Sequence, residues 1–79
     1  MAFYIIIIKI DESIDKVVYA FCPNKQEMGK LEITKKNGTI EILKPLEIQN
    51  SQALFKRAAA KVYKHWKNNE FPPRTAWES

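Results

Sequence analysis

The sequence has few of the residues on which most enzyme chemistry depends. Its 79 residues include one cysteine, Cys22, one histidine, His65, and two glycines. A single cysteine excludes an intramolecular disulfide, and one cysteine with one histidine cannot supply the usual zinc-binding patterns. The glycine-rich loops that bind phosphates are also absent. We therefore expect no enzyme activity, no cofactor and no metal site, and the free cysteine favours a cytoplasmic setting.

A small enzyme is the least favoured of three functional hypotheses. It would need Cys22 and His65 to meet in space as a nucleophile and its base, near carboxylates such as those of Asp11, Glu12 and Asp15. Cys22 lies in an apolar segment, where cysteine is usually a buried small side chain. His65 lies near the end of a predicted helix, where it complements the helix dipole. A chain of this length also has little room for a pocket.

Long hydrophobic runs are missing too. The longest, from Ala2 to Ile8, is far shorter than the roughly 20 residues that span a bilayer. No basic residue precedes it and no small-residue cleavage site follows, so we expect neither a signal peptide nor a membrane partner. With 46% hydrophobic and 28% charged residues, the composition is typical of a folded globular chain. At this size we expect one domain, residues 1–79.

Segments rich in β-branched and aromatic residues predict a four-stranded antiparallel sheet made of two hairpins. The expected strands are residues 2–10, 17–22, 30–36 and 39–44. Pro23 and Asn24 end the second strand, and the polar stretch to Gly29 is a predicted loop. Asn37-Gly38 is typical of a two-residue type I′ turn, which would place Ile33 opposite Ile42.

An amphipathic helix is predicted over residues 51–69, with Asn50 or Ser51 as its capping side chain. Leu54, Ala58 and Val62 share one side of it. A short extended tail, residues 70–79, follows and contains Pro72-Pro73. The fold class is therefore α+β, in the order ββββα, with the helix at the C-terminal end of the sheet.

Both faces of the first predicted hairpin are apolar, although one helix covers only one face of a sheet. We therefore expect an interface on the second face, most simply of a homodimer. The equally weighted alternative is coverage by the tail segment 71–77 of the same chain. The residues expected at a sheet-face interface are Tyr4, Ile6, Ile8 and Trp77.

The positive charge of the chain is concentrated in the predicted helix. Five basic residues and no acidic one lie between Glu47 and Glu70, while the remaining eight basic and nine acidic residues carry −1, which together give the net charge of +4. Such a surface is expected either to meet an anion, as nucleic acid or an acidic protein, or to be simply a solvated face. The residues are Lys56, Arg57, Lys61, Lys64 and Lys67.

The favoured hypothesis is a small non-catalytic protein-interaction module, of an accessory, immunity or regulatory type. It would act through the apolar sheet face and the basic helix face, on a protein partner or on a second copy of itself. The alternative is a nucleic-acid-binding protein that uses the basic helix, although no motif specific to nucleic-acid readers is present.

Overall fold

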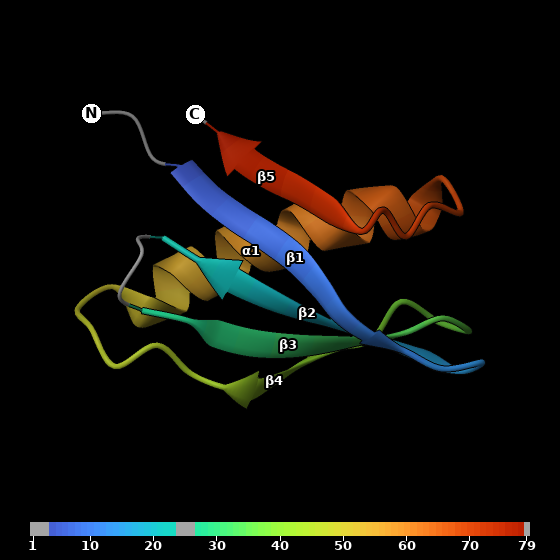
Figure 1. Cartoon of the computed structure of the whole chain (residues 1–79), viewed down its shortest axis with the longest axis horizontal. Coiled ribbons are helices and arrows are strands. Elements are labelled where there is room, and N and C mark those ends of the chain that lie inside the picture. The colour runs from blue at the N-terminus through green and yellow to red at the C-terminus, as the bar shows by residue number, and fades with distance from the viewer. Residues whose placement is uncertain (1–3, 24–26, 79) are drawn as a thin grey trace.

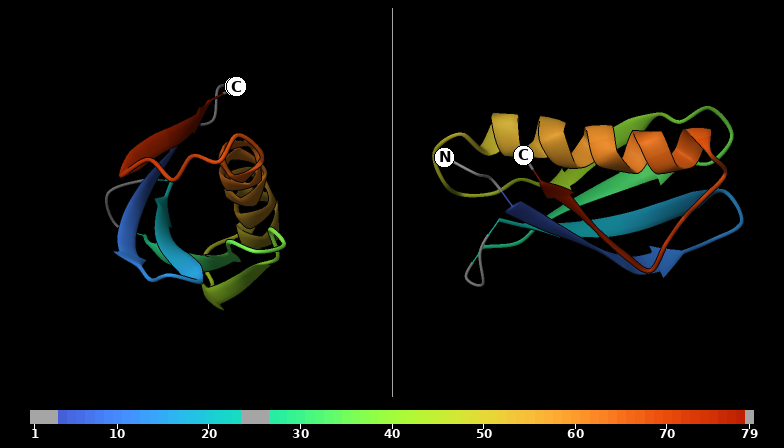
Figure 2. Two further views of the ribbon diagram at one scale, coloured as in Figure 1. Left: turned by 90° about the vertical axis from the view of Figure 1, so that its right-hand side faces the viewer. Right: turned by 90° about the horizontal axis from the view of Figure 1, so that it is seen from above.

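The computed structural model describes residues 4–23 and 27–78, which form five strands and one helix. The strands are β1 (Tyr4–Glu12), β2 (Lys16–Cys22), β3 (Gly29–Thr34), β4 (Ile40–Lys44) and β5 (Arg74–Glu78), and helix α1 (Ser51–Lys67) connects β4 to β5. All strand pairs are antiparallel, in the order β4-β3-β2-β1-β5. The helix lies across one face of this sheet, which gives two layers (Figure 1, Figure 2).

The α+β class and the antiparallel sheet with one helix are confirmed, but the predictions of four strands and a C-terminal helix are wrong. Part of the predicted tail is the fifth strand, which pairs with β1 so that Tyr4 lies opposite Glu78 and Ile8 opposite Arg74. Thr75 and Trp77, a β-branched and an aromatic residue, lie two positions apart in this strand, and the preceding Pro72-Pro73 favours an extended backbone. Residues 2, 3 and 24–26 of the predicted strand and loop lie outside the described residues.

The turn between β3 and β4 differs from the predicted type I′ turn. Gly38 has a positive φ of 73°, but Asn37 is not among the positive-φ residues. The hairpin closes at Thr34 and Thr39 instead, through a hydrogen bond from the Thr34 amide to the Thr39 carbonyl. Ile33 therefore lies opposite Ile40, not Ile42. Because this shift is an even number of residues, the predicted faces of the hairpin are unchanged.

The core lies between α1 and the face of the sheet that we call the inner face. Side chains from alternate positions of the three central strands are fully buried there, as the alternation predicted. They are Ile5, Ile7, Val17, Tyr19, Phe21, Leu31 and Ile33, and they pack against Leu54, Ala58 and Val62 of the helix. Gly29 is required at this face because a Cβ built on it would lie 2.4 Å from Cζ of Phe21.

Backbone groups bond at both ends of the helix, and the Asn68 side-chain amide also donates to the Lys64 carbonyl at the C-terminal end. Asn50 is the N-cap in a left-handed conformation and makes no side-chain capping hydrogen bond, so the predicted cap is wrong. Its carbonyl accepts from the Leu54 amide instead. Asn69 has a φ of 57° and lies beyond the last helical residue, Lys67, so the helix is two residues shorter than predicted. The helix is neither long nor apolar enough to cross a membrane, and it is the sole helix of the described ranges.

Candidate interaction surfaces

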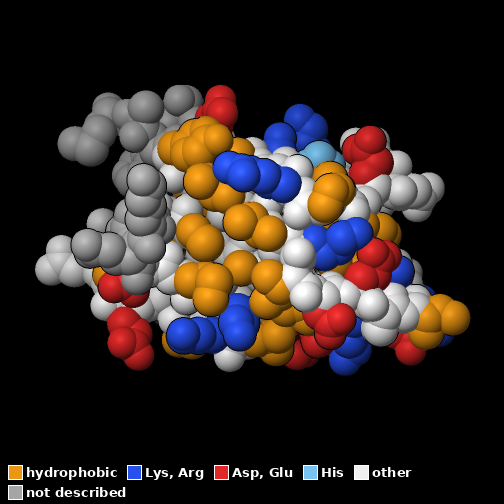
Figure 3. All heavy atoms as spheres, in the orientation of Figure 1, with side chains coloured by type: hydrophobic (Ala, Val, Ile, Leu, Met, Phe, Trp, Pro, Cys, Tyr) orange, Lys and Arg blue, Asp and Glu red, His pale blue; other side chains and the backbone are white. Residues whose placement is uncertain are grey.

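The face of the sheet turned away from α1, called the outer face here, carries a patch of exposed apolar side chains. Tyr4 and Ile8 are 50% and 37% exposed there, and Ile10, in the bulge of β1, is 47% exposed next to them in the chain. Ile6 and Cys22 lie opposite each other on β1 and β2 and are partly exposed. Figure 3 shows apolar side chains gathered over the sheet on this side of the molecule, with basic side chains around them. The outer face is therefore apolar and open to solvent.

The segment expected to cover this face lies elsewhere. Phe71 and Trp77 pack against the core on the side of the helix. Trp77 pairs with buried Ile5, and the guanidinium of Arg57 lies 5.4 Å from the centre of its ring. Coverage of the outer face by the tail is therefore wrong, because the tail joins the edge of the sheet rather than its surface. Trp77 also lies apart from Tyr4, Ile6 and Ile8, on the opposite face.

Charged side chains border the outer patch. Arg74 of β5 lies opposite Ile8, and Lys30 of β3 lies opposite Ala20, so one cation stands on each side of the patch. Further out on the same face, Lys16 and Glu32 form an ion pair at 3.3 Å. A partner surface that fits here would be apolar at its centre and would carry acidic groups at its rim.

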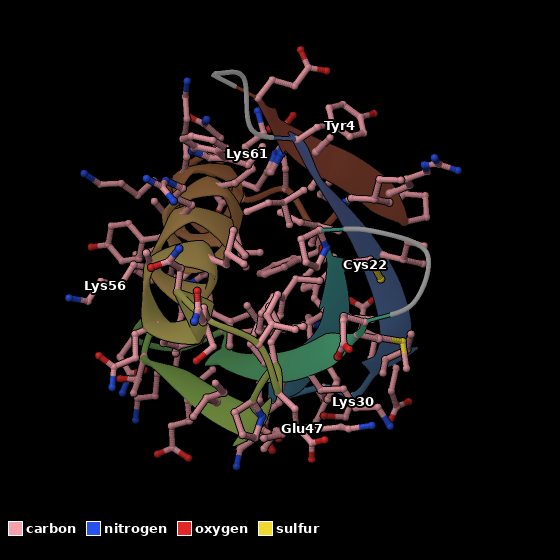
Figure 4. All side chains as sticks on the ribbon, turned by 90° about the vertical axis from the view of Figure 1, so that its left-hand side faces the viewer. Tyr4, Cys22, Lys30, Glu47, Lys56 and Lys61 are labelled. Carbon is pink, nitrogen blue, oxygen red and sulfur yellow. The ribbon has the colours of Figure 1, made fainter. Side chains whose placement is uncertain are left out.

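The basic side chains of α1 lie on the helix side of the molecule, across the sheet from the outer face. Lys56, Lys64 and Lys67 are exposed, while Arg57 and Lys61 are partly buried toward β5. Within the described part of the chain, none of the four lysines among them forms an ion pair with an acidic side chain. Figure 4 shows Lys56 extending from the helix on the side opposite to Cys22. The five predicted residues therefore form one basic face.

The structure separates Cys22 from His65. Cys22 lies on the outer face, where desolvation raises the pKa of its thiol. His65 lies on α1 at the other face, with Nε2 2.9 Å from the Thr75 hydroxyl and Nδ1 3.4 Å from a Glu70 carboxylate oxygen. The sheet stands between them, so they do not form a nucleophile and base. The described residues also hold no cluster of three or more side chains suited to a metal ion.

A cluster of charged side chains that the sequence analysis did not predict holds the segment before β5 in place. Glu12 accepts hydrogen bonds from Lys9 and Lys35, both at 2.7 Å. The hydrogen bond from Lys35, followed by that from Lys9, lowers the pKa of Glu12 from 4.5 to about 2. The Lys9 ammonium also donates to the Phe71 carbonyl at 2.9 Å. Lys9 and Glu12 are three residues apart, but Lys35 and Phe71 are distant in sequence, so local spacing could have indicated only the Lys9–Glu12 pair.

Two further polar contacts hold the same region. The Tyr19 hydroxyl donates to the Pro72 carbonyl at 2.9 Å. Desolvation, with a smaller contribution from the negative charge of Glu12, raises the pKa of Tyr19 to about 12. The Trp66 indole N–H donates to the Lys35 carbonyl at 2.7 Å. These contacts close the core at the end of the sheet where β1 and β2 meet, and they fix the path by which the chain enters β5.

Comparison with known proteins adds no functional assignment. No family model matches the chain, and no curated protein or solved structure matches it.

Proposed function

We propose that the chain is a small non-catalytic protein-interaction module that works through its outer sheet face. The observation that carries this proposal is an exposed apolar patch that neither the helix nor β5 covers. Tyr4, Ile8 and Ile10 keep a third to a half of their surface in water. Burial of each contributes about 1 kcal/mol to association. A contiguous apolar area on a folded protein is a common mark of an interaction surface.

The partner that fits this face is a protein with an apolar centre and acidic groups at its rim. Arg74 and Lys30 lie on opposite sides of the patch, so acidic groups on the partner would meet a cation at either border. Cations at the rim add orientation and association rate more than affinity, while the apolar centre supplies most of the affinity.

The test uses a partner identified by crosslinking and then purified. A photo-crosslinking phenylalanine analogue at position 4 would capture the protein that contacts the patch. Binding of this purified protein to the wild type and to Ile8→Lys is then compared by calorimetry. A lysine at this position puts a charge into the contact, so affinity should fall about 30-fold. Circular dichroism would verify that the variant is folded.

The matched control is Ile14→Lys. Ile14 is 89% exposed and lies between β1 and β2, away from the patch. The same change in charge and apolar surface should leave affinity within about threefold of the wild type. The proposal is rejected if position 4 yields no partner that binds when purified, or if Ile8→Lys and Ile14→Lys bind alike.

The second candidate function is nucleic-acid binding by the basic face of α1. The observation in its favour is that Lys56, Lys61, Lys64 and Lys67 remain without acidic partners among the described residues after folding. Phosphates would supply those partners. Fluorescence anisotropy with labelled DNA and RNA at several salt concentrations tests this. Each lost phosphate contact should lower the slope of log affinity against log salt by about one unit.

The variant for this second test is Lys56→Gln with Lys64→Gln, and its matched control is Lys36→Gln with Lys44→Gln. All four lysines are exposed, but the control pair lies outside the helix. The helix variant should reduce the salt slope by about two units, while the control should not change it. Absence of binding to both nucleic acids at low salt removes this candidate.

A further inference from the structure

β5 forms one edge of the sheet (Figure 1), so half of its backbone N–H and C=O groups point away from β1. The Lys9 amide donates to the Pro73 carbonyl at 2.9 Å, which marks that pair as hydrogen-bonded. Hydrogen-bonded pairs alternate along antiparallel strands, so Thr75 and Trp77 direct their backbone groups to β1. The N–H and C=O groups of Arg74, Ala76 and Glu78 therefore point outward from the sheet.

The sequence of β5 is complementary to itself in the antiparallel direction. When two copies of Arg-Thr-Ala-Trp-Glu are paired about Ala76, Arg74 of each copy lies opposite Glu78 of the other. Both side chains are exposed on the outer face, at positions facing Ile8 and Tyr4 in β1. Directly opposed side chains of opposite charge stabilise an antiparallel pair. The same two-fold pairing places Thr75 opposite Trp77 on the inner face.

Hydrogen bonding and charge select the same register. Pairing about Ala76 joins all three outward residues of one copy with all three of the other, so that every outward N–H and C=O of β5 has a partner. A slip of two residues loses one of the three residue pairs and separates Arg74 from Glu78. A slip of one residue sets outward groups against groups that already bond β1. The best register for the backbone is thus also the best for the charges.

The other edge of the sheet lacks these properties. β4 is followed directly by Pro45, and its pairing with β3 is interrupted between Lys30 and Leu31. Proline and irregular pairing are devices that protect edge strands from association. Pairing of β4 with itself about Ile42 would place Lys44 opposite Ile40, with no opposed charges. β5 has no internal proline and pairs regularly with β1.

We infer that β5 is the interface of a homodimer, in which antiparallel pairing of two copies about Ala76 makes one continuous ten-stranded sheet. The occupant of the edge is a second copy of this chain, because β5 is complementary to itself in both charge and backbone hydrogen bonding. The dimer is expected to be weak, because a five-residue strand buries little surface. It does not depend on the outer-face proposal, although it would join two outer faces into one.

The experiment is sedimentation equilibrium of the full chain over a wide concentration range, for the wild type and four variants. Ala76→Pro removes the central outward N–H but no hydrogen bond to β1, and proline is tolerated on an edge strand. It should abolish the dimer. Arg74→Glu sets acidic side chains opposite each other at two symmetric positions and should weaken the dimer about tenfold. The reciprocal exchange, Arg74→Glu with Glu78→Arg, should restore wild-type affinity.

Ile8→Lys distinguishes the edge from the outer face. A dimer that survives Ile8→Lys but not Ala76→Pro supports the inference, while one that survives Ala76→Pro and fails with Ile8→Lys overturns it. A wild-type chain that stays monomeric at millimolar concentration also overturns it. If Ala76→Pro does not fold, the charge exchange still tests the inference. Failure of Arg74→Glu with Glu78→Arg to restore the dimer would contradict pairing about Ala76.

Discussion

Replacement of Gly29 by alanine should destabilise the protein through one contact. The new Cβ would lie 2.4 Å from Cζ of Phe21 and 2.8 Å from both Cε atoms. The Phe21 ring is fully buried and its centre lies 6.0 Å from that of Phe55, so the ring cannot swing into solvent. Overpacking of this kind costs about 1–3 kcal/mol. The smaller conformational freedom of alanine in the unfolded chain offsets roughly 0.5 kcal/mol of this cost, which leaves a net loss of about 0.5–2.5 kcal/mol.

Urea denaturation followed by tryptophan fluorescence measures this loss, and a double-mutant cycle tests its cause. In a Phe21→Leu background the smaller side chain leaves room for the Cβ, so Gly29→Ala should cost about 0.5 kcal/mol or less. A Gly29→Ala variant as stable as the wild type would refute the packing argument. An equal cost in both backgrounds would show that the backbone of β3, rather than the Phe21 ring, requires glycine.

Three further predictions concern the polar contacts around the segment before β5. Because Lys35 and Lys9 lower the pKa of Glu12 to about 2, the stability that Glu12 contributes is present above pH 4.5 and is lost as the pH falls toward 2. Glu12→Gln should therefore flatten the acid side of a plot of melting temperature against pH. Because desolvation raises the pKa of Tyr19 to about 12, stability should fall by about 2 kcal/mol between pH 10 and 12, and Tyr19→Phe should remove this decline in alkaline denaturation curves. Trp66→Phe deletes the donor to the Lys35 carbonyl and should cost about 1–2 kcal/mol in urea denaturation.

The faces of the strands could be predicted from the sequence, whereas their pairing could not. Side-chain alternation depends only on local geometry, so the inner positions Ile5, Ile7 and Tyr19 follow directly from the pattern. The register of β3 and β4 depends on turn geometry, and Asn37-Gly38 fits more than one turn. β5 was missed because a five-residue strand after two prolines resembles an extended tail. Only the pairing of this segment with β1, which is far away in sequence, distinguishes a strand from an extended tail.

For the candidate surfaces too, features set by local periodicity could be predicted and features set by distant pairing could not. The basic residues from Lys56 to Lys67 share one face because helical periodicity is local. The apolar outer face was indicated by the two-sided pattern of β1 and β2, but Trp77 could not be placed without the position of β5. The charge cluster of Glu12 with Lys9 and Lys35 depends on the irregular pairing of β1 between Lys9 and Asp11, and the local sequence does not predict this irregularity.

The position of β5 beside β1 also has a consequence for the order of folding. The Lys9 ammonium and the Phe71 carbonyl that it binds are separated by 62 residues. The pairs β1–β2, β2–β3 and β3–β4 connect neighbouring segments, so they pay much less chain entropy to form. We expect a late step in which β5 docks onto a meander already covered by α1. Until then the free edge of β1 lies beside an exposed apolar outer face, which makes this stage the most prone to aggregation.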